Sequence, residues 1–154
     1  STLGAECFFH RAHEKAPDVC SIDDEFVLVW GDDYHPINYR RLLKAHSEHG
    51  LPITMTVIEG HDTFNLHHQN GLVVEYSKVD QKATYNGYEA GTSIVRKSVI
   101  DDIGKSGVWS WEETVYPTYS GRIHAYLDET PFWDMGTPER LSKLEEYFQS
   151  RRTR

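Results

Sequence analysis

The strongest constraint on the fold is the stretch FVLVWGDD, residues 26–33, in which five apolar residues run directly into a glycine and two carboxylates. A strand without polar residues is typical of a sheet that helices cover on both faces. Ligands of open α/β sheets bind outside the carboxyl ends of the strands, which is where Asp32 and Asp33 are expected. Carboxylates there suit a hard divalent cation, but Gly-Asp-Asp is also good turn chemistry. These residues alone support a cation site and a solvated turn equally.

Hydrophobic periodicity and capping residues predict strands that alternate with helices. Asn38 and Gly50 are expected to cap a helix between them, Asn70-Gly71 predicts a hairpin turn, and Thr137-Pro138 predicts the start of the last helix. The expected strands are 26–30, 53–58, 66–68, 72–76, 90–95 and 122–127, and further helices are expected at 3–15 and 98–103. The pattern indicates one α/β domain with a mainly parallel sheet and an antiparallel hairpin excursion.

Composition excludes several classes of function. The chain has 154 residues and a net charge of −8, which argues against nucleic acid as a partner. Its apolar runs are too short for a membrane span, so we expect a cytoplasmic protein without a membrane partner. Cys7 and Cys20 are interpreted as reduced thiols, and the nine histidines form no recognised metal motif.

A second acidic stretch, FWDMGTPERL at residues 132–141, places Asp134 after aromatic residues and before a capped helix. Together with LVWGDD it resembles the sugar-phosphate nucleotidyltransferases, also called nucleoside-diphosphate-sugar pyrophosphorylases. Three further stretches resemble segments of that family in the same order, namely NGLV at 70–73, TYNGYEAGTSIVRKSVID at 84–101 and VWSWEETVYP at 108–117. The resemblance implies a Rossmann-like mixed, mostly parallel sheet flanked by helices, of the nucleotide-diphospho-sugar transferase type.

The resemblance also implies an activity and a set of site residues. Family members join a sugar 1-phosphate to the nucleotidyl group of a nucleoside triphosphate and release pyrophosphate, with Mg²⁺ as the cofactor. The implied metal ligands and catalytic residues are Asp32 and Asp134, and Asp33 would be an outer residue of the site or a turn residue. The implied substrate-binding residues are Gly4, Lys78, Glu89, Gly91 and Glu112.

Two departures from the family bear on the sugar. The family's Glu-Lys-Pro segment is Ser77-Lys78-Val79 here, and its Asn-Ala-Gly segment begins with Glu89. The expected pair of aspartates should converge at the carboxyl edge of the sheet, and in the absence of a metal one of them should have a raised pKa.

The largest departure is that no Gly-x-Gly-Thr-Arg loop, which holds the triphosphate in the family, occurs in the sequence. We therefore expect one N-terminally incomplete domain, 1–154, that lacks pyrophosphorylase turnover by itself. The alternatives are an inactive sugar-nucleotide-binding or regulatory paralogue and a glycosyltransferase of the same fold. Without the missing unit, the apolar strand 26–30 should be covered by another copy, another chain or a local segment such as the helix with Phe8 and Phe9.

Overall fold

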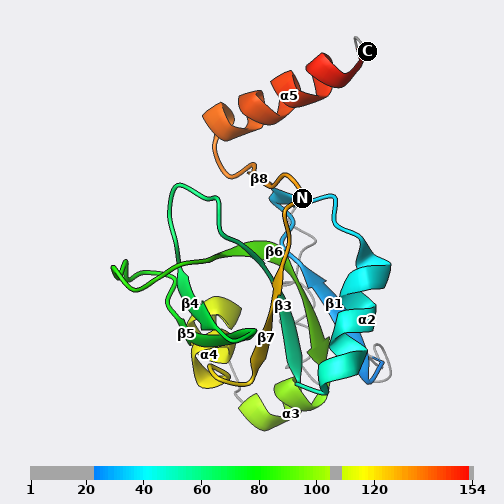
Figure 1. The fold of residues 1–154 in the computed structure, drawn as a ribbon, viewed down its shortest axis with the longest axis vertical. Helices are drawn as coiled ribbons and strands as arrows, with labels where there is room; N and C mark the ends of the chain where they lie inside the picture. The colour runs from blue at the N-terminus through cyan, green and yellow to red at the C-terminus, as the bar shows by residue number, and fades with distance from the viewer. Residues whose placement is uncertain (1–22, 105–108, 153–154) are drawn as a thin grey trace.

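The protein contains a six-stranded sheet with helices on both faces and a separate two-stranded layer (Figure 1). The computed structural model describes residues 23–104 and 109–152. Along this part of the chain the elements are β1 (Glu25–Val29), β2 (Asp33–Tyr34), α2 (Tyr39–His49), β3 (Ile53–Ile58), β4 (Leu66–Gln69), β5 (Leu72–Tyr76), β6 (Tyr88–Arg96), α3 (Ser98–Ile103), α4 (Trp111–Thr118), β7 (Ile123–Leu127), β8 (Trp133–Asp134) and α5 (Pro138–Arg152). The helix expected at 3–15, together with Gly4, lies outside the described residues.

Strand directions correct one expectation and confirm the fold class. The large sheet has the order β1-β6-β3-β7-β5-β4, and within the described residues only β3 and β7 are parallel neighbours. The expected α/β class with a mixed sheet is confirmed, but the expectation of mostly parallel pairing is wrong. β6 enters between β1 and β3 in the opposite direction to both, and β5 runs antiparallel to β7. The hydrophobic pattern identifies β6 as a strand but does not show which strands it enters between, and this placement decides the pairing direction.

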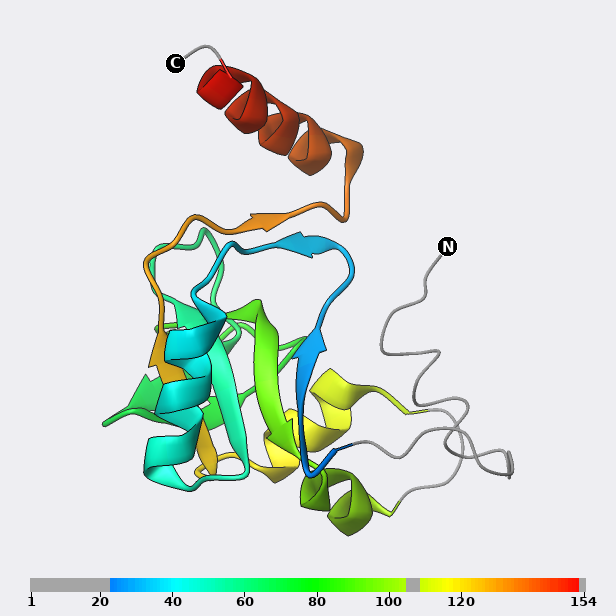
Figure 2. The same cartoon turned by 90° about the vertical axis from the view of Figure 1, so that its right-hand side faces the viewer.

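The carboxyl ends of three strands still meet at one edge of the sheet. Since β6 is antiparallel to both β1 and β3, and β3 is parallel to β7, the strands β1, β3 and β7 run in the same direction. The start of β6 lies at the same edge. The β2–β8 pair forms its own layer beyond that edge, between the sheet and α5 (Figure 2). Segments from distant parts of the sequence are thus brought together there.

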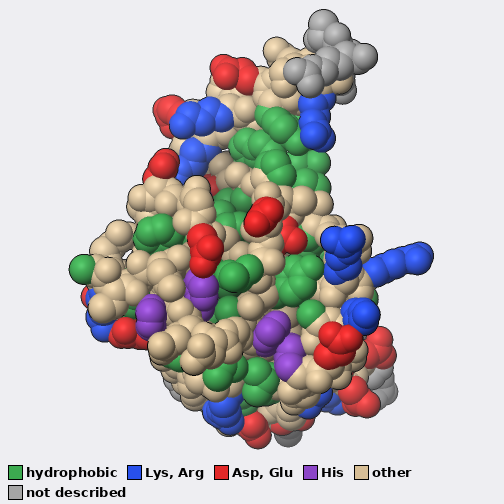
Figure 3. Space-filling view, in the orientation of Figure 1, with side chains coloured by type: hydrophobic (Ala, Val, Ile, Leu, Met, Phe, Trp, Pro, Cys, Tyr) green, Lys and Arg blue, Asp and Glu red, His purple; other side chains and the backbone are tan. Residues whose placement is uncertain are grey.

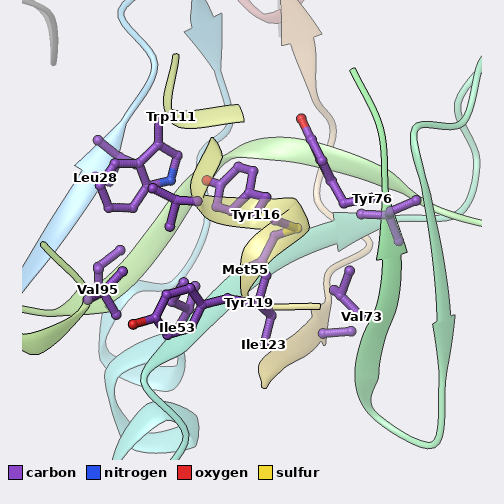
Figure 4. Close-up of a cluster of buried hydrophobic side chains, with 14 of the residues drawn as sticks. Leu28, Ile53, Met55, Val73, Tyr76, Val95, Trp111, Tyr116, Tyr119 and Ile123 are labelled. Atoms are coloured by element: carbon purple, nitrogen blue, oxygen red, sulfur yellow. The ribbon is translucent and has the colours of Figure 1, made fainter. Parts of the chain in front are cut away.

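Two hydrophobic clusters hold the helices on opposite faces of the sheet. The larger cluster includes Met55, Val95 and Tyr116 and buries α4 (Figure 4). The smaller one joins Leu42 of α2 to Ile94, the residue next to Val95 in β6. Because neighbouring residues of a strand point to opposite faces, Ile94 and Val95 place α2 and α4 on opposite sides.

Local capping and turn signals are confirmed. The Asn38 side chain accepts from Arg41 N, and Gly50 ends α2 in the left-handed conformation. Asn70 and Gly71 both have positive φ, 54° and 76°, as the two-residue hairpin turn requires. The observed bounds of β3 and α3 also match the expected strand 53–58 and the expected helix 98–103. No helix among the described residues has the length and apolar character needed to cross a bilayer.

The apolar strand is buried on one face rather than two. Leu28 in β1 is 6% exposed, whereas Val27 and Val29 are 41% and 42% exposed. β1 is also an edge of the described sheet, with β6 as its neighbour on the inner side. The continuous apolar run therefore does not correspond to a central strand in this part of the chain.

Candidate active site at the carboxyl edge of the sheet

The two acidic stretches of the sequence lie side by side in the β2–β8 layer. Asp33 pairs with Asp134 in the antiparallel register, and Tyr34 pairs with Trp133. A further backbone hydrogen bond joins Met135 N to Asp32 O at 2.7 Å. This pairing brings together two aspartate segments that are about a hundred residues apart in the sequence, as the resemblance required.

Asp32 and Asp134 converge on Gly136. A methyl group added at this glycine would lie 3.0 Å from Asp134 Oδ1 and 3.8 Å from Asp32 Oδ2. Gly136 N donates to Asp134 Oδ1 at 2.6 Å, and the Arg140 guanidinium forms an ion pair with Asp134 Oδ2. The Asp134 carboxylate is therefore oriented by two donors while its neighbour Asp32 lies within the same small region.

A bulge in β6 brings Gly91 against Asp33. In the register with β3, Met55 faces Ser93 and Val57 faces Glu89, so three residues of β6 oppose a single residue of β3. Gly91 lies within this bulge with φ of 75°, and Trp30 N donates to its carbonyl at 2.9 Å. A methyl group at Gly91 would overlap the Asp33 carboxylate. Only glycine fits both the conformation and the space.

Asp33 has a raised pKa. Burial, followed by the nearby charges of Asp32, Asp134 and Glu112, raises its pKa to about 7. A raised pKa was expected on one of the two converging aspartates, Asp32 or Asp134, with Asp33 as an outer residue of the site or a turn residue. Asp33 is partly buried beside both of them, and burial contributes more to its raised pKa than the repulsion from the neighbouring carboxylates does.

Glu89 is a buried carboxyl beside the same bulge. It is 5% exposed and accepts from Trp30 Nε1, at 3.0 and 3.1 Å to its two oxygens, and from Gly91 N at 3.0 Å. Burial, followed by the charges of Asp33 and Glu112, raises its pKa to about 8. We use the name carboxylate cluster for the acidic residues linked by these interactions, which are Asp32, Asp33, Glu89, Glu112 and Asp134.

Lys78 is held at the border of the cluster by Glu112. Its ammonium forms an ion pair with Glu112 Oε2, and the hydroxyl of Tyr76 donates to Glu112 Oε1 at 3.3 Å. The hydrogen bond to Glu112 raises the pKa of Lys78 despite partial burial, and the charge of Asp32 acts in the same direction. Lys78 therefore contacts the cluster through Glu112. Ser110 caps α4 and so sets the position of Glu112 in its first turn.

Arg140 and His35 were not singled out from the sequence. The position of Arg140 in the sequence could have indicated its role. Arg140 lies in the first turn of α5, where a cation is unfavourable unless a carboxylate neutralises it. His35 gave no signal, because its partners lie on β6 and on the segment after β7.

The donor set suits a hard cation that keeps most of its water. Among the described residues, no three His, Cys, Asp or Glu side chains are arranged to hold a metal ion. Mg²⁺ in phosphate-binding sites is commonly held by one or two carboxylates together with water and substrate oxygens. Asp32 and Asp134 provide such a pair, in a region whose crowded carboxylates favour a bound cation.

Comparison with known proteins gives the fold. No protein-family model and no curated protein matches the chain. Among solved structures, HddC from Yersinia pseudotuberculosis matches with a TM-score of 0.69 at 22% identity, over 96% of this chain and 64% of that one. The same protein complexed with GMP-PN gives 0.68 at 20% identity, with the same coverage of both chains. A putative glucose-1-phosphate thymidylyltransferase from Bacillus anthracis, in complex with a sucrose, gives 0.65 at 13% identity over 78% of this chain and 52% of that one.

The chain has a nucleotidyltransferase-like fold. The sequence identities are too low to carry an activity, and the chain spans less than two thirds of the length of these neighbours.

Proposed function

We propose that this chain forms the cation- and sugar-phosphate-binding part of a nucleotidyltransferase, which joins a nucleoside triphosphate to a sugar 1-phosphate and releases pyrophosphate. The observation that carries the proposal is the convergence of Asp32 and Asp134 on Gly136, next to a bulge that exposes glycine backbone to Asp33. The neighbours' bound GMP-PN and sucrose support nucleotide and sugar as ligand classes.

Each residue has a distinct role in this proposal. Asp32 and Asp134 would hold Mg²⁺, which neutralises phosphate charge when bound. Lys78 would offer a point charge to the sugar phosphate, with Glu112 fixing its position in the absence of ligand. The bulge at Gly91 leaves room for the Asp33 carboxylate close to the backbone, and Glu89 would be the nearest acid to a sugar hydroxyl.

Electrostatics make a cation a requirement for phosphate binding. Of the five acidic side chains in the carboxylate cluster, Glu89 has a pKa of about 8 and is mostly protonated at pH 7, while Glu112 and Asp134 are paired with Lys78 and Arg140. Asp32 and the partly ionised Asp33, whose pKa is about 7, leave the cluster with a net negative charge. An anionic substrate would be repelled by this excess of negative charge. Cation binding at Asp32 and Asp134 should therefore precede or accompany binding of the sugar phosphate.

Two other functions compete with this proposal. One is an inactive paralogue that only binds a sugar nucleotide. A glycosyltransferase would also use aspartates at strand ends, but the Asp134-Met-Gly-Thr-Pro segment favours the nucleotidyltransferase. Pyrophosphate release from a nucleoside triphosphate and a sugar 1-phosphate would exclude both alternatives. We expect none from this chain alone, so cation and sugar-phosphate binding are the measurements that test the proposal.

Calorimetric titration with Mn²⁺, used in place of Mg²⁺, tests the proposal directly. Asp32→Asn and Asp134→Asn should each weaken Mn²⁺ binding by more than about tenfold, the low end of the loss seen for outer partners of metal ligands. Asp101→Asn, a change at an exposed acid of α3, is the matched control and should bind as the wild type does. Glucose 1-phosphate should bind only with Mn²⁺ present. Equal Mn²⁺ affinity in all four proteins would refute the proposed site.

A further inference from the structure

The bulge in β6 is connected to the rest of the site by a buried histidine. His35 is 8% exposed, and its Nδ1 donates to the carbonyl of Ala90 at 3.1 Å. Thr56 Oγ1 reaches the same carbonyl at 3.3 Å but lies closer, at 2.8 Å, to the carbonyl of Thr92. His35 is therefore the shorter side-chain donor to the residue that precedes Gly91.

The other side of the ring contacts the segment that leads to Asp134. Nε2 of His35 lies 3.4 Å from both Thr130 Oγ1 and Asp128 Oδ1. The same Asp128 oxygen accepts from Thr130 N at 2.8 Å, and Asp128 N donates to Val57 O at 3.0 Å. With Nδ1 donating, Nε2 of the neutral ring accepts from the Thr130 hydroxyl. Burial, the largest influence, lowers the pKa of His35 and favours this neutral form.

Other contacts between the β2–β8 layer and the large sheet are the close approach of Asp33 to Gly91 and the packing of Phe132, beside β8, on Tyr88 of β6, with ring centroids 5.9 Å apart. Each strand of the layer has two residues, so the layer contributes little stability by itself. Its aromatic residues pack toward α5: Tyr34 lies against Phe148, with ring centroids 5.1 Å apart, and Trp133 lies against Tyr147 at 4.0 Å. Figure 3 shows the hydrophobic side chains gathered in this band. His35 adds a hydrogen-bonded link in the opposite direction, toward β6.

We propose that His35 is a positioning residue, which holds the segments carrying Asp33, Gly91 and Asp134 in register without touching substrate or metal. His35 lies two residues after Asp33 in the sequence. Its ring donates to the carbonyl of Ala90, which precedes Gly91, and contacts Thr130 in the loop before Asp134. A site whose two metal ligands come from different segments depends on their relative position within a fraction of an ångström. This inference rests on the proposed function, because its first readout is cation affinity.

The test compares two buried histidines. His35→Leu removes both hydrogen bonds at similar volume, and His35→Asn keeps an amide donor where Nδ1 stood. His46→Leu is the matched control, since His46 is 0% exposed, has its own Nδ1 contact to Thr54 at 2.6 Å and lies in α2, away from the cluster. Mn²⁺ affinity is measured by calorimetry at a temperature where circular dichroism shows every variant folded. Amide hydrogen exchange of residues 131–136 is the second readout.

We expect His35→Leu to weaken Mn²⁺ binding about tenfold, as loss of an outer partner typically does, and to speed exchange at 131–136. His35→Asn should recover most of the affinity, and His46→Leu should lower the melting temperature without changing either readout. Affinity within twofold of wild type in His35→Leu, or an equal loss in His46→Leu, would overturn the inference.

Failure of the proposed function has a different signature. If the wild type binds no Mn²⁺, the metal site is refuted, and exchange alone decides the role of His35. Faster exchange in His35→Leu but not in His46→Leu then supports positioning, and equal exchange overturns it. Should His35→Leu not fold, Thr130→Val removes the hydroxyl donor to Nε2 at nearly constant volume. It should speed the same exchange, and unchanged exchange would count against the inference.

Discussion

Gly91 is the residue at which backbone conformation and site chemistry meet. Its φ of 75° is unfavourable for any residue with a side chain, and the space beside its α-carbon is filled by Asp33. Gly121 offers a comparison, because its φ of 82° is similar but nothing lies within 4 Å of an added methyl group. Substituting alanine at Gly121 therefore measures the cost of the left-handed backbone alone, whereas the same change at Gly91 adds the cost of overlap with Asp33.

Substitution of these glycines should give unequal losses. Gly121→Ala should lower the free energy of unfolding by about 1–2 kcal/mol, the cost of a left-handed backbone. Gly91→Ala should cost about 1–3 kcal/mol more, as overpacked sites do. Urea denaturation of both variants measures the difference. Adding Asp33→Ala to Gly91→Ala should remove most of the excess, and equal losses for the two glycines would show that Asp33 does not press on Gly91.

At the scale of elements, α2 rests on a group of histidines that are best accommodated neutral. Nδ1 of His49 accepts from Leu51 N at 2.9 Å, and its ring stacks on His124 with centroids 4.2 Å apart. Burial, then the charges of His124 and His46, lowers the pKa of His49 to about 4. Protonation at Nδ1 would replace an acceptor with a second donor facing Leu51 N–H. Glu25 and Arg96 are the other charged groups nearby.

The folded protein should therefore lose stability in mild acid. A lowered pKa in the folded state means that the unfolded chain binds more protons between the usual histidine pKa of 6.5 and about 4. The contribution of His49 to stability is complete above pH 6.5 and is lost as the pH falls through this range. Urea unfolding at pH 7.5, 5.5 and 4.5 measures it. His49→Gln should flatten the dependence, whereas His61→Gln, outside this group, should leave it unchanged; identical curves for the two variants would contradict the assignment.

Sequence signals predicted the elements better than their arrangement. Asn38, Gly50 and Asn70-Gly71 act within a few residues, so their effects are visible locally. The direction of β6 depends on which strands it enters between, and a two-residue strand such as β2 is too short to show periodicity. For the site, the resemblance predicted that Asp32 and Asp134 converge, and both carboxylates lie beside Gly136. The crowding of Asp33 and the contacts of His35 depend on the bulge in β6, for which the sequence gives only a glycine.

For the whole molecule, the exposed outer side of β1 is the feature that most needs explanation. Val27 and Val29 are 41% and 42% exposed, on the same face as Ile94 and therefore on the α2 side of the sheet. Tyr39 and Leu43 of α2 are similarly exposed, at 43% and 46%. An apolar edge strand is a hazard that native proteins normally cover. The helix expected at 3–15 as a possible cover lies outside the described residues, and about a third of the HddC chain lies outside its match to this chain.

We therefore expect β1 to be covered in solution, by another copy, another chain or a segment of this one. If copies of the chain associate through β1, Val27→Glu should shift sedimentation toward the monomer. If a segment of the same chain covers β1, Val27→Glu should instead expose apolar surface and bind a hydrophobic dye. Val74→Glu is the matched control, because Val74 of β5 is 39% exposed and lies away from this edge. The monomer shift and the dye binding expected for Val27→Glu both follow from the cost of placing a charge in a buried contact, which is about 1–3 kcal/mol or more. Three results together would show that β1 is uncovered. The wild type would be monomeric, the β1 amides would exchange as fast as those of a free edge strand, and Val27→Glu and Val74→Glu would give the same sedimentation and dye binding.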